Sequence, residues 1–202
     1  MKIAIVKYNA GNVESVKNAL NRLDLEPIIS DDAEILQTAD KVIFPGVGEA
    51  STAMNYLRER KLDEVIKSLN QPVLGICLGM QVMAKCSYEG GHYECLDWFN
   101  AEVVRLEPSD LNLRVPHVGW NNINYSSGSI LFANLPASPD VYFVHSYHMQ
   151  CSDSQDEIAN CEYGGNVTVA VQKRNIMAVQ FHPEKSQDYG LTILENFLRW
   201  QS

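Results

Sequence analysis

Short apolar runs alternate with amphipathic stretches in the first half of this chain. The runs are typical of buried strands and occupy residues 2–7, 27–29, 41–44 and 73–77. Between them, apolar residues recur every three or four positions, which predicts helices over residues 13–23, 50–58 and 62–69. A further short helix is predicted to start at Asp31 and Asp32. Asn12 is the candidate N-cap of the first helix. Strands separated by helices pair in parallel, so the pattern predicts a doubly wound α/β fold.

The second half of the chain changes to strands joined by turns. Strands are predicted over residues 103–106, 129–132, 141–145, 167–172 and 176–181. Residues 126–128 and 164–166 have the composition of turns, and the second of these fits a hairpin. A final helix is predicted over residues 189–200. We therefore expect one domain, residues 1–202, with a mostly parallel sheet flanked by helices and antiparallel strands in its second half.

Composition narrows the class of protein. The chain has 202 residues, of which 46% are hydrophobic and 20% charged, as is ordinary for one globular domain. Its formal net charge of −9 argues against a nucleic-acid partner, which would need a basic face. Five cysteines without compact spacing indicate a reducing compartment rather than a disulfide framework. No apolar stretch approaches the roughly 20 residues that cross a bilayer, so we expect a cytoplasmic protein with no membrane partner.

The most reactive candidate is Cys77, in the sequence Gly75-Ile76-Cys77-Leu78-Gly79. An apolar run leads into this segment and a helical pattern follows it, which is the arrangement of a nucleophile elbow with a thiol. Glycines are tolerated where the neighbouring backbone would crowd a side chain, and a helix N-terminus favours the thiolate. The alternative is that Cys77 is a small buried apolar residue. The two flanking glycines favour a catalytic thiol.

A cysteine nucleophile needs a base, and the base needs an orienting group. His182 follows a predicted strand at the edge where an α/β sheet collects its ligands, and Glu184 can lie on the same side of an extended segment. Pro183 restricts the backbone between them. Alternatively, His182 is a structural histidine and Glu184 a solvated loop charge. Together with Cys77, the pair completes a candidate triad.

Acyl transfer also needs N–H donors for the oxyanion. The amide of Leu78, directly after the nucleophile, is one candidate. The loop Pro45-Gly46-Val47-Gly48 is the other, since it would end at the same sheet edge and its glycines let a peptide turn toward the substrate. A phosphate cradle is the competing interpretation of this loop, but its third glycine is lacking.

Two further groups of residues permit other chemistry. His145, His148 and Cys151 have a spacing that would suit metal ligands on a helix, but the apolar run before them predicts a strand, so we expect no metal. His117 and Trp120 lie in an aromatic, glycine-bearing loop, residues 116–121. That loop either packs locally or contacts a partner, because exposed tryptophans are favoured anchors.

The sequence resembles the class I (triad) glutamine amidotransferases over essentially its whole length. The general motifs are GICLGMQ at residues 75–81 and FHPEKS at residues 181–186. Within the family, the chain is most similar to the glutaminase subunits of imidazole glycerol phosphate synthase. The motifs for this narrower likeness are YNAGN, PGVG, PHVGWN and YFVHSYH, at residues 8–12, 45–48, 116–121 and 142–148. The chain departs from the family pattern at residues 49–51 and 90–99, away from the candidate triad.

The resemblance assigns a role to each matching position. It implies Cys77 as nucleophile, His182 as acid–base and Glu184 as orienting group, with an oxyanion hole around Val47 and Gly48. It places contacts to glutamine at Gln81, Glu89, His145, Ser146 and Tyr147. It places the partner interface at Asn12, Trp120 and Tyr142.

The resemblance also implies an activity and a partner. The chain would hydrolyse L-glutamine to L-glutamate and ammonia without a cofactor. The ammonia would pass to a separate (β/α)₈ cyclase subunit, bound as a heterodimer, which forms imidazole glycerol phosphate and AICAR in histidine biosynthesis. Rival interpretations are a peptidase-like or stress-response protein with an elbow cysteine, a non-catalytic scaffold, and the glutaminases of anthranilate, GMP or pyridoxal phosphate synthesis. The candidate triad and the narrower motifs weigh against them.

Overall fold

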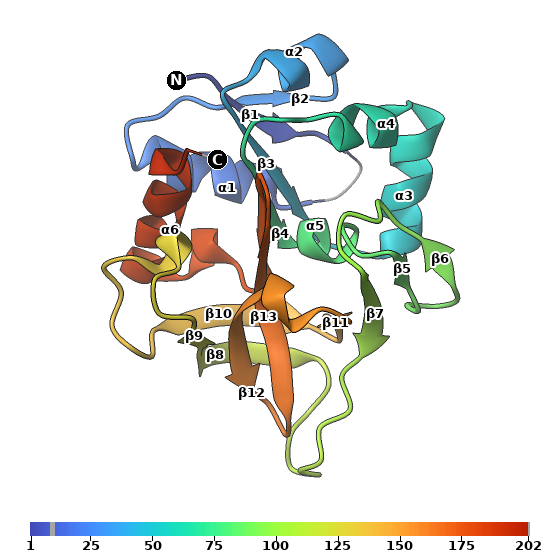
Figure 1. Cartoon of the computed structure of the whole chain (residues 1–202), viewed down its shortest axis with the longest axis vertical. Coiled ribbons are helices and arrows are strands. Elements are labelled where there is room, and N and C mark those ends of the chain that lie inside the picture. The colour runs from blue at the N-terminus through green and yellow to red at the C-terminus, as the bar shows by residue number, and fades with distance from the viewer. Residues whose placement is uncertain (9–10, 202) are drawn as a thin grey trace.

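An eight-stranded sheet forms the centre of the molecule in the computed structural model, which describes residues 1–8 and 11–201 (Figure 1). Across the sheet the strands are β2 (Ile28–Ser30), β1 (Ile3–Val6), β3 (Lys41–Gly46), β4 (Val73–Cys77), β14 (Ile176–Val179), β13 (Asn166–Lys173), β12 (Glu157–Glu162) and β9 (Asn124–Tyr125). The pairs from β2 to β14 are parallel and those from β14 to β9 are antiparallel. Asn9 and Ala10 of the YNAGN motif lie outside the described residues.

Helices cover both faces of the parallel part of this sheet (Figure 1). One face carries α1 (Val13–Asn21) and α6 (Gln187–Arg199), and the other α2 (Ala33–Thr38), α3 (Ala50–Glu59), α4 (Leu62–Lys67) and α5 (Leu78–Gln81). Side chains alternate between the faces, so that Ile5 packs in the core of the first group and Ala4 in that of the second. In the described part of the chain, no helix is long and apolar enough to cross a membrane.

Smaller sheets fill the second half. β10 (Asp140–His145) pairs antiparallel with β8 (His117–Asn122). The third sheet consists of β11 (Tyr147–Cys151), β7 (Ala101–Arg105), β5 (Cys86–Ser87) and β6 (Tyr93–Glu94). Short 3₁₀ turns are η1 (Ile130–Phe132), η2 (Ser154–Asp156) and η3 (Pro183–Lys185). The predicted doubly wound α/β fold with antiparallel strands in the second half is confirmed.

Several predictions of local structure were wrong in this second half. Residues 129–132 are not a strand but include η1, because Leu131 and Phe132 bury their side chains beneath α6, where Asn196 Nδ2 donates to the Leu131 carbonyl at 3.0 Å. Residues 116–121 were predicted to be a loop, but all of them except Pro116 belong to β8. The strands β11 and β12 were missed, since their polar residues conceal the alternation.

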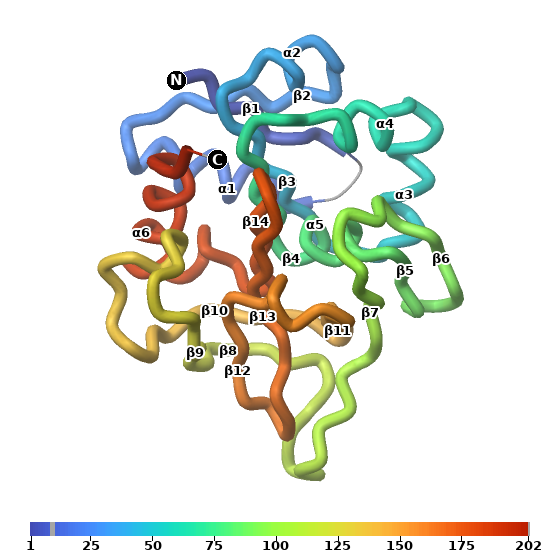
Figure 2. The backbone as a smooth tube through the Cα atoms, viewed as in Figure 1, coloured from blue at the N-terminus to red at the C-terminus, as the bar shows by residue number. Residues whose placement is uncertain are grey.

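The register of the parallel strands brings three segments to one edge of the sheet. Gly46 at the end of β3 lies opposite Cys77 at the end of β4. On the other side of β4, Ile76 pairs with Val179, the last residue of β14. Figure 2 shows β4 and β14 running together toward the middle of the molecule, where β10 crosses below them. The PGVG loop, Cys77 and the segment that contains His182 therefore start from neighbouring strand ends.

Candidate active site

The turn at Cys77 has the backbone geometry that the glycine pattern predicts. Cys77 has φ 54° and ψ −108°, a conformation that is costly for a residue with a Cβ. A Cβ on Gly79 would lie 1.7 Å from the carbonyl oxygen of Phe44, so only glycine lets α5 pack this closely on β3. However, α5 is a single turn of four residues, which leaves only a small helix dipole to favour the thiolate.

His182 and Glu184 form a buried pair beside this turn. His182 Nδ1 lies 2.7 Å from Glu184 Oε1, and neither side chain is exposed. Burial lowers the pKa of His182, but the neighbouring Cys77 and Glu184 outweigh it and raise the pKa to about 9. With Nδ1 occupied, Nε2 has no hydrogen-bond partner among the described residues. Nε2 is therefore the nitrogen that can exchange a proton with a thiol or a substrate.

The segment around His182 is tied to β10 by its backbone. The amide of His182 donates to the carbonyl of Tyr142 at 2.9 Å. The hydroxyl of Ser186 donates to the carbonyl of His182 at 2.7 Å and accepts from the amide of Tyr142 at 3.0 Å. Ser186 lies in the FHPEKS motif, but the sequence predicted no role for it. The Ser186 side chain is completely buried and bonds to two backbone groups, so it fixes the loop that carries His182 and Glu184.

Asn12 differs from the sequence prediction. It precedes α1 but has φ 79°, and its side chain makes no hydrogen bond to the helix N-terminus. The amide instead donates to Glu184 Oε1, with Nδ2 also 3.2 Å from His182 Nδ1. Asn12 thus does not cap α1 with its side chain, because its backbone is left-handed rather than extended and its amide group is turned toward Glu184.

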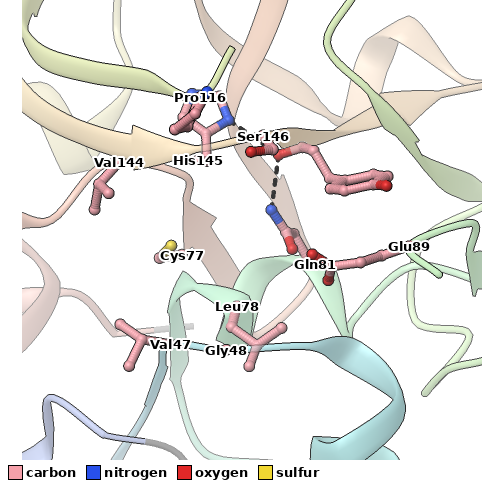
Figure 3. Close-up of a pocket in the computed structure, with 11 residues that line it drawn as sticks. Val47, Gly48, Cys77, Leu78, Gln81, Glu89, Pro116, Val144, His145 and Ser146 are labelled. Atoms are coloured by element: carbon pink, nitrogen blue, oxygen red, sulfur yellow. Dashed lines mark hydrogen bonds between the residues drawn. The ribbon is translucent and has the colours of Figure 1, made fainter.

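One pocket of about 320 Å³ lies in front of Cys77 (Figure 3). Nine of the residues proposed from the sequence line it: Val47, Gly48, Cys77, Leu78, Gln81, Glu89, His145, Ser146 and Tyr147. Pro116 and Val144 complete the lining and had no predicted role. His182 and Glu184 are not among the lining residues, and neither are Asn12, Trp120 and Tyr142. In Figure 3 the sulfur faces the cavity between Val47 and Val144.

Among the described residues that line the pocket, Glu89 is the only one with a carboxylate. Burial raises its pKa, an effect opposed by the backbone N–H of Ala50, whose nitrogen lies 3.4 Å from Glu89 Oε2. At neutral pH an ammonium group beside Glu89 would relieve the cost of burying this charge. Such an arrangement selects a ligand with a cationic end.

The loop after β3 lies on the other side of the sulfur. Val47 and Gly48 line the pocket together with Leu78, and Gly48 has φ 109°, which favours glycine (Figure 3). Tyr8, to which the sequence assigned no role, lies beneath this loop: a Cβ on Gly46 would come within 1.8 Å of its hydroxyl. The pKa of Tyr8 is raised by burial and, to a smaller extent, by Cys77.

His145, which lines the pocket, is buried against a second histidine, His117. His117 Nδ1 lies 3.2 Å from His145 Nε2, and the His117 ring stacks between Phe143 and Tyr163 with centroids 4.6 and 3.8 Å away. Burial lowers the pKa of His117 to about 4 and that of His145 to about 3. In the residues that the structure describes, no three His, Cys, Asp or Glu side chains are placed to hold a metal ion.

Trp120 and Tyr142 lie next to each other on β8 and β10. Their positions are paired in the two-stranded sheet, and the ring centroids are 6.0 Å apart in an edge-on arrangement. Trp120 is 45% exposed and Val118, on the same strand, 56%. His117 from the same segment is buried, so only part of the aromatic segment at residues 116–121 is available to a partner.

Comparison with proteins of known sequence places the chain among close relatives. The subunit HisH of imidazole glycerol phosphate synthase from Bacteroides thetaiotaomicron is 50% identical over 198 residues, covering 98% of this chain and 99% of that protein. The HisH subunit from Sulfurimonas denitrificans is 44% identical over 205 residues, with 99% of each chain covered.

Solved structures share the fold at low sequence identity. A glutamine amidotransferase matches with a TM-score of 0.75 at 20% identity, covering 98% of this chain and 99% of the other. A glutamine amidotransferase from Thermotoga maritima matches with a TM-score of 0.66 at 18% identity, covering 98% and 82%. The sequence profile of the family described as "Glutamine amidotransferase class-I" matches residues 4–200. The chain therefore belongs to the class-I glutamine amidotransferase family.

Proposed function

We propose that this chain is a glutaminase that hydrolyses L-glutamine to L-glutamate and ammonia, with Cys77 as nucleophile, His182 as acid–base and Glu184 as the group that orients the imidazole. The main support is the buried His182–Glu184 pair, 2.7 Å between Nδ1 and Oε1, beside a cysteine that opens onto a pocket. The raised pKa of His182, about 9, keeps the imidazole protonated at neutral pH and suits it to a thiolate partner.

The proposed reaction has two halves. The Cys77 thiolate attacks the side-chain carboxamide carbon, and the oxyanion accepts hydrogen bonds from backbone N–H groups. His182 donates its proton to the departing nitrogen, and ammonia leaves a thioester. His182 then takes a proton from water, the resulting hydroxide attacks the thioester, and glutamate is released as the thiol re-forms. Glu184 holds Nδ1 throughout and stabilises the imidazolium.

The pocket lining supports the substrate assignment. Glu89 would pair with the α-ammonium of glutamine, and the segment His145-Ser146-Tyr147 would supply backbone or side-chain contacts to the substrate's other end. The N–H groups of Leu78 and of Val47 or Gly48 would form the oxyanion hole. The volume of about 320 Å³ is at the lower end of the range for small-molecule sites, as a single amino acid requires.

We further propose that the chain acts as the glutaminase subunit of an imidazole glycerol phosphate synthase in histidine biosynthesis, in a reducing cytoplasm. The full-length similarity to two HisH subunits supports this assignment. Ammonia would pass directly to a (β/α)₈ cyclase subunit docked against Asn12, Trp120 and Tyr142. The backbone bonds between Tyr142 and the His182 segment would connect that interface to the active site, so the isolated chain is expected to be a weak glutaminase.

Glutamate release from glutamine, measured with and without a cyclase subunit, tests both proposals. Activity should rise on addition of the cyclase and should fall at least about 1000-fold in Cys77→Ala. Cys151→Ala, which changes a half-buried cysteine on β11, is the matched control and should remain active. Full activity in Cys77→Ala would overturn the nucleophile assignment. If the cyclase neither binds nor stimulates an active chain, the synthase assignment fails and the glutaminase assignment stands.

A further inference from the structure

Gln180 lies directly beside the sulfur of Cys77. Its side chain is fully buried, and its Nε2 is 3.6 Å from Cys77 Sγ, within hydrogen-bonding distance for sulfur. The strand register accounts for this contact. Val179 lies opposite Ile76, so the next residue of each strand, Gln180 and Cys77, meet just beyond the last pair.

The direction of the Gln180 amide follows from its neighbours. The carbonyl of Tyr147 can only accept, and it lies 2.8 Å from Gln81 Nε2, which fixes the orientation of the Gln81 amide. The same Nε2 donates to Gln180 Oε1 at 3.1 Å. A flipped Gln180 would place two amide donors opposite each other. Gln180 therefore directs its NH₂ group at the sulfur.

The accepting carbonyl of Tyr147 is itself held from a second side. His145 Nδ1 lies 2.9 Å from it, and Figure 3 shows the two bonds that meet at this oxygen. Burial keeps His145 neutral, with its pKa lowered to about 3, so Nδ1 must carry the hydrogen and Nε2 must accept from His117. Each hydrogen bond in the series that leads from His117 to the sulfur of Cys77 therefore has only one possible donor.

We infer that the Gln180 carboxamide donates a hydrogen bond to the Cys77 sulfur and holds it for attack, and that Gln81 fixes this donor from the pocket side. The inference rests on the proposed function for the role of Cys77 as nucleophile. An N–H donor stabilises a sulfur anion more than a neutral thiol. Since both N–H groups of Gln81 are used within the protein, only its Oε1 is left for a ligand. A ligand that donates to Oε1 would act on the same amide that orients Gln180.

Alkylation of Cys77 by iodoacetamide in the isolated chain tests the inference, followed as a function of pH by the mass of the Cys77 peptide. In Gln180→Met, which keeps the size but removes the donor, the rate at neutral pH should fall about tenfold. The midpoint of the pH profile should rise by about one unit. Gln180→Glu keeps the acceptor for Gln81 but replaces the donor by an oxygen, and should be at least as slow. With glutamine as substrate, kcat should fall while KM changes little.

Asn196→Ala is the control for losing a buried amide elsewhere. Asn196 in α6 donates to the carbonyls of Leu131 and Ala133, so its loss should lower the melting temperature without changing the alkylation profile. If either Gln180 variant has the same pH profile of alkylation as the wild type, the inference is wrong. If Gln180→Met is slowed but Gln180→Glu reacts like the wild type, only the hydrogen bond that residue 180 accepts from Gln81 is needed. The alkylation assay uses neither glutamine nor a partner. A shifted profile in a chain without glutaminase activity would therefore contradict only the proposed function.

Discussion

At the scale of single residues, the same fold shifts histidines in opposite directions. His182 is buried yet has its pKa raised to about 9, because Cys77 and Glu184 favour the imidazolium. Burial lowers the pKa of His117 to about 4, and burial together with the neighbouring histidines lowers that of His145 to about 3. The raised pKa of His182 supports its proposed role as the acid–base group. The other two shifts keep the hydrogen-bonded pair His117–His145 neutral at the pocket wall.

The buried histidines make stability sensitive to acid. The pKa of His117 is about 6.5 in the unfolded chain and about 4 in the folded one, so between these values only the unfolded chain takes up the proton. Stability is fully present above the unfolded value and is lost as pH falls toward the folded value. His117→Phe, which keeps an aromatic ring between Phe143 and Tyr163, should reduce this slope by about 1.4 kcal/mol per pH unit.

Urea unfolding at neutral and mildly acidic pH measures that slope. Because His117→Phe leaves His145 Nε2 without its donor, the variant should also lose about 1–2 kcal/mol at neutral pH. The same substitution at the exposed His92 is the control. Equal slopes for the wild type and His117→Phe would show that this histidine is protonated in the folded state.

At the scale of elements, the elbow depends on how closely α5 crosses β3. Gly79→Ala would place a Cβ 1.7 Å from the backbone oxygen of Phe44, which cannot move without breaking the sheet. We expect a loss of more than about 3 kcal/mol in the free energy of unfolding. Gly75→Ala is the matched variant, since its Cβ would meet the flexible end of Met83 at 2.7 Å. This substitution should lower the free energy of unfolding by about 1–3 kcal/mol. Denaturant unfolding that ranked the two in the reverse order would contradict this account.

The helix α2 begins with a side-chain cap at Asp32, in the segment where the sequence predicted a helix to start. Asp32 Oδ1 accepts from the amides of Glu34 and Ile35 at 2.9 and 3.1 Å. Asp32→Ala should therefore lower the free energy of unfolding by about 1 kcal/mol. Asp32→Asn retains an accepting oxygen and should stay within a few tenths of the wild type. Urea melts of both variants check the prediction, and an equal loss in both would mean that charge matters more than the cap.

At the scale of the whole molecule, the exposed pair Trp120 and Tyr142 connects to the active site through backbone. Tyr142 bonds to His182 and Ser186, so a partner bound at β8 and β10 would press on the segment that carries the proposed base. This arrangement offers a direct physical route for partner activation. It needs no change in the central sheet.

Trp120→Ala should weaken binding of the cyclase subunit at least about tenfold, because exposed tryptophans at interface centres contribute strongly to affinity. Titration calorimetry with the purified cyclase measures the change, and circular dichroism confirms that the variant is folded. Ile28→Ala is the control, since Ile28 is 40% exposed on β2, away from β8 in Figure 1. Unchanged affinity in Trp120→Ala would move the proposed interface elsewhere.

The first half of the fold could be predicted from sequence because its signals are local. The strands that bury both faces are continuous apolar runs, as in β1 and β4, and the helices between them have one apolar face. In β11 and β12, polar residues face solvent or the small sheets, and pairing decides their conformation. For the same reason Leu131 and Phe132, apolar and strand-like, form a 3₁₀ turn beneath α6.

The chemical groups of the site could be recognised in the chain without a structure: a cysteine between glycines and a histidine with a carboxylate two residues on, in a chain with a full-length family likeness. Which of these groups touch depends on the packing of distant segments. Strand register brings Gln180 to Cys77, and a left-handed backbone turns the amide of Asn12 toward Glu184 instead of the helix that it was predicted to cap. Such contacts join residues more than a hundred positions apart. Their hydrogen-bond geometry comes from packing, so it leaves no local pattern in the sequence.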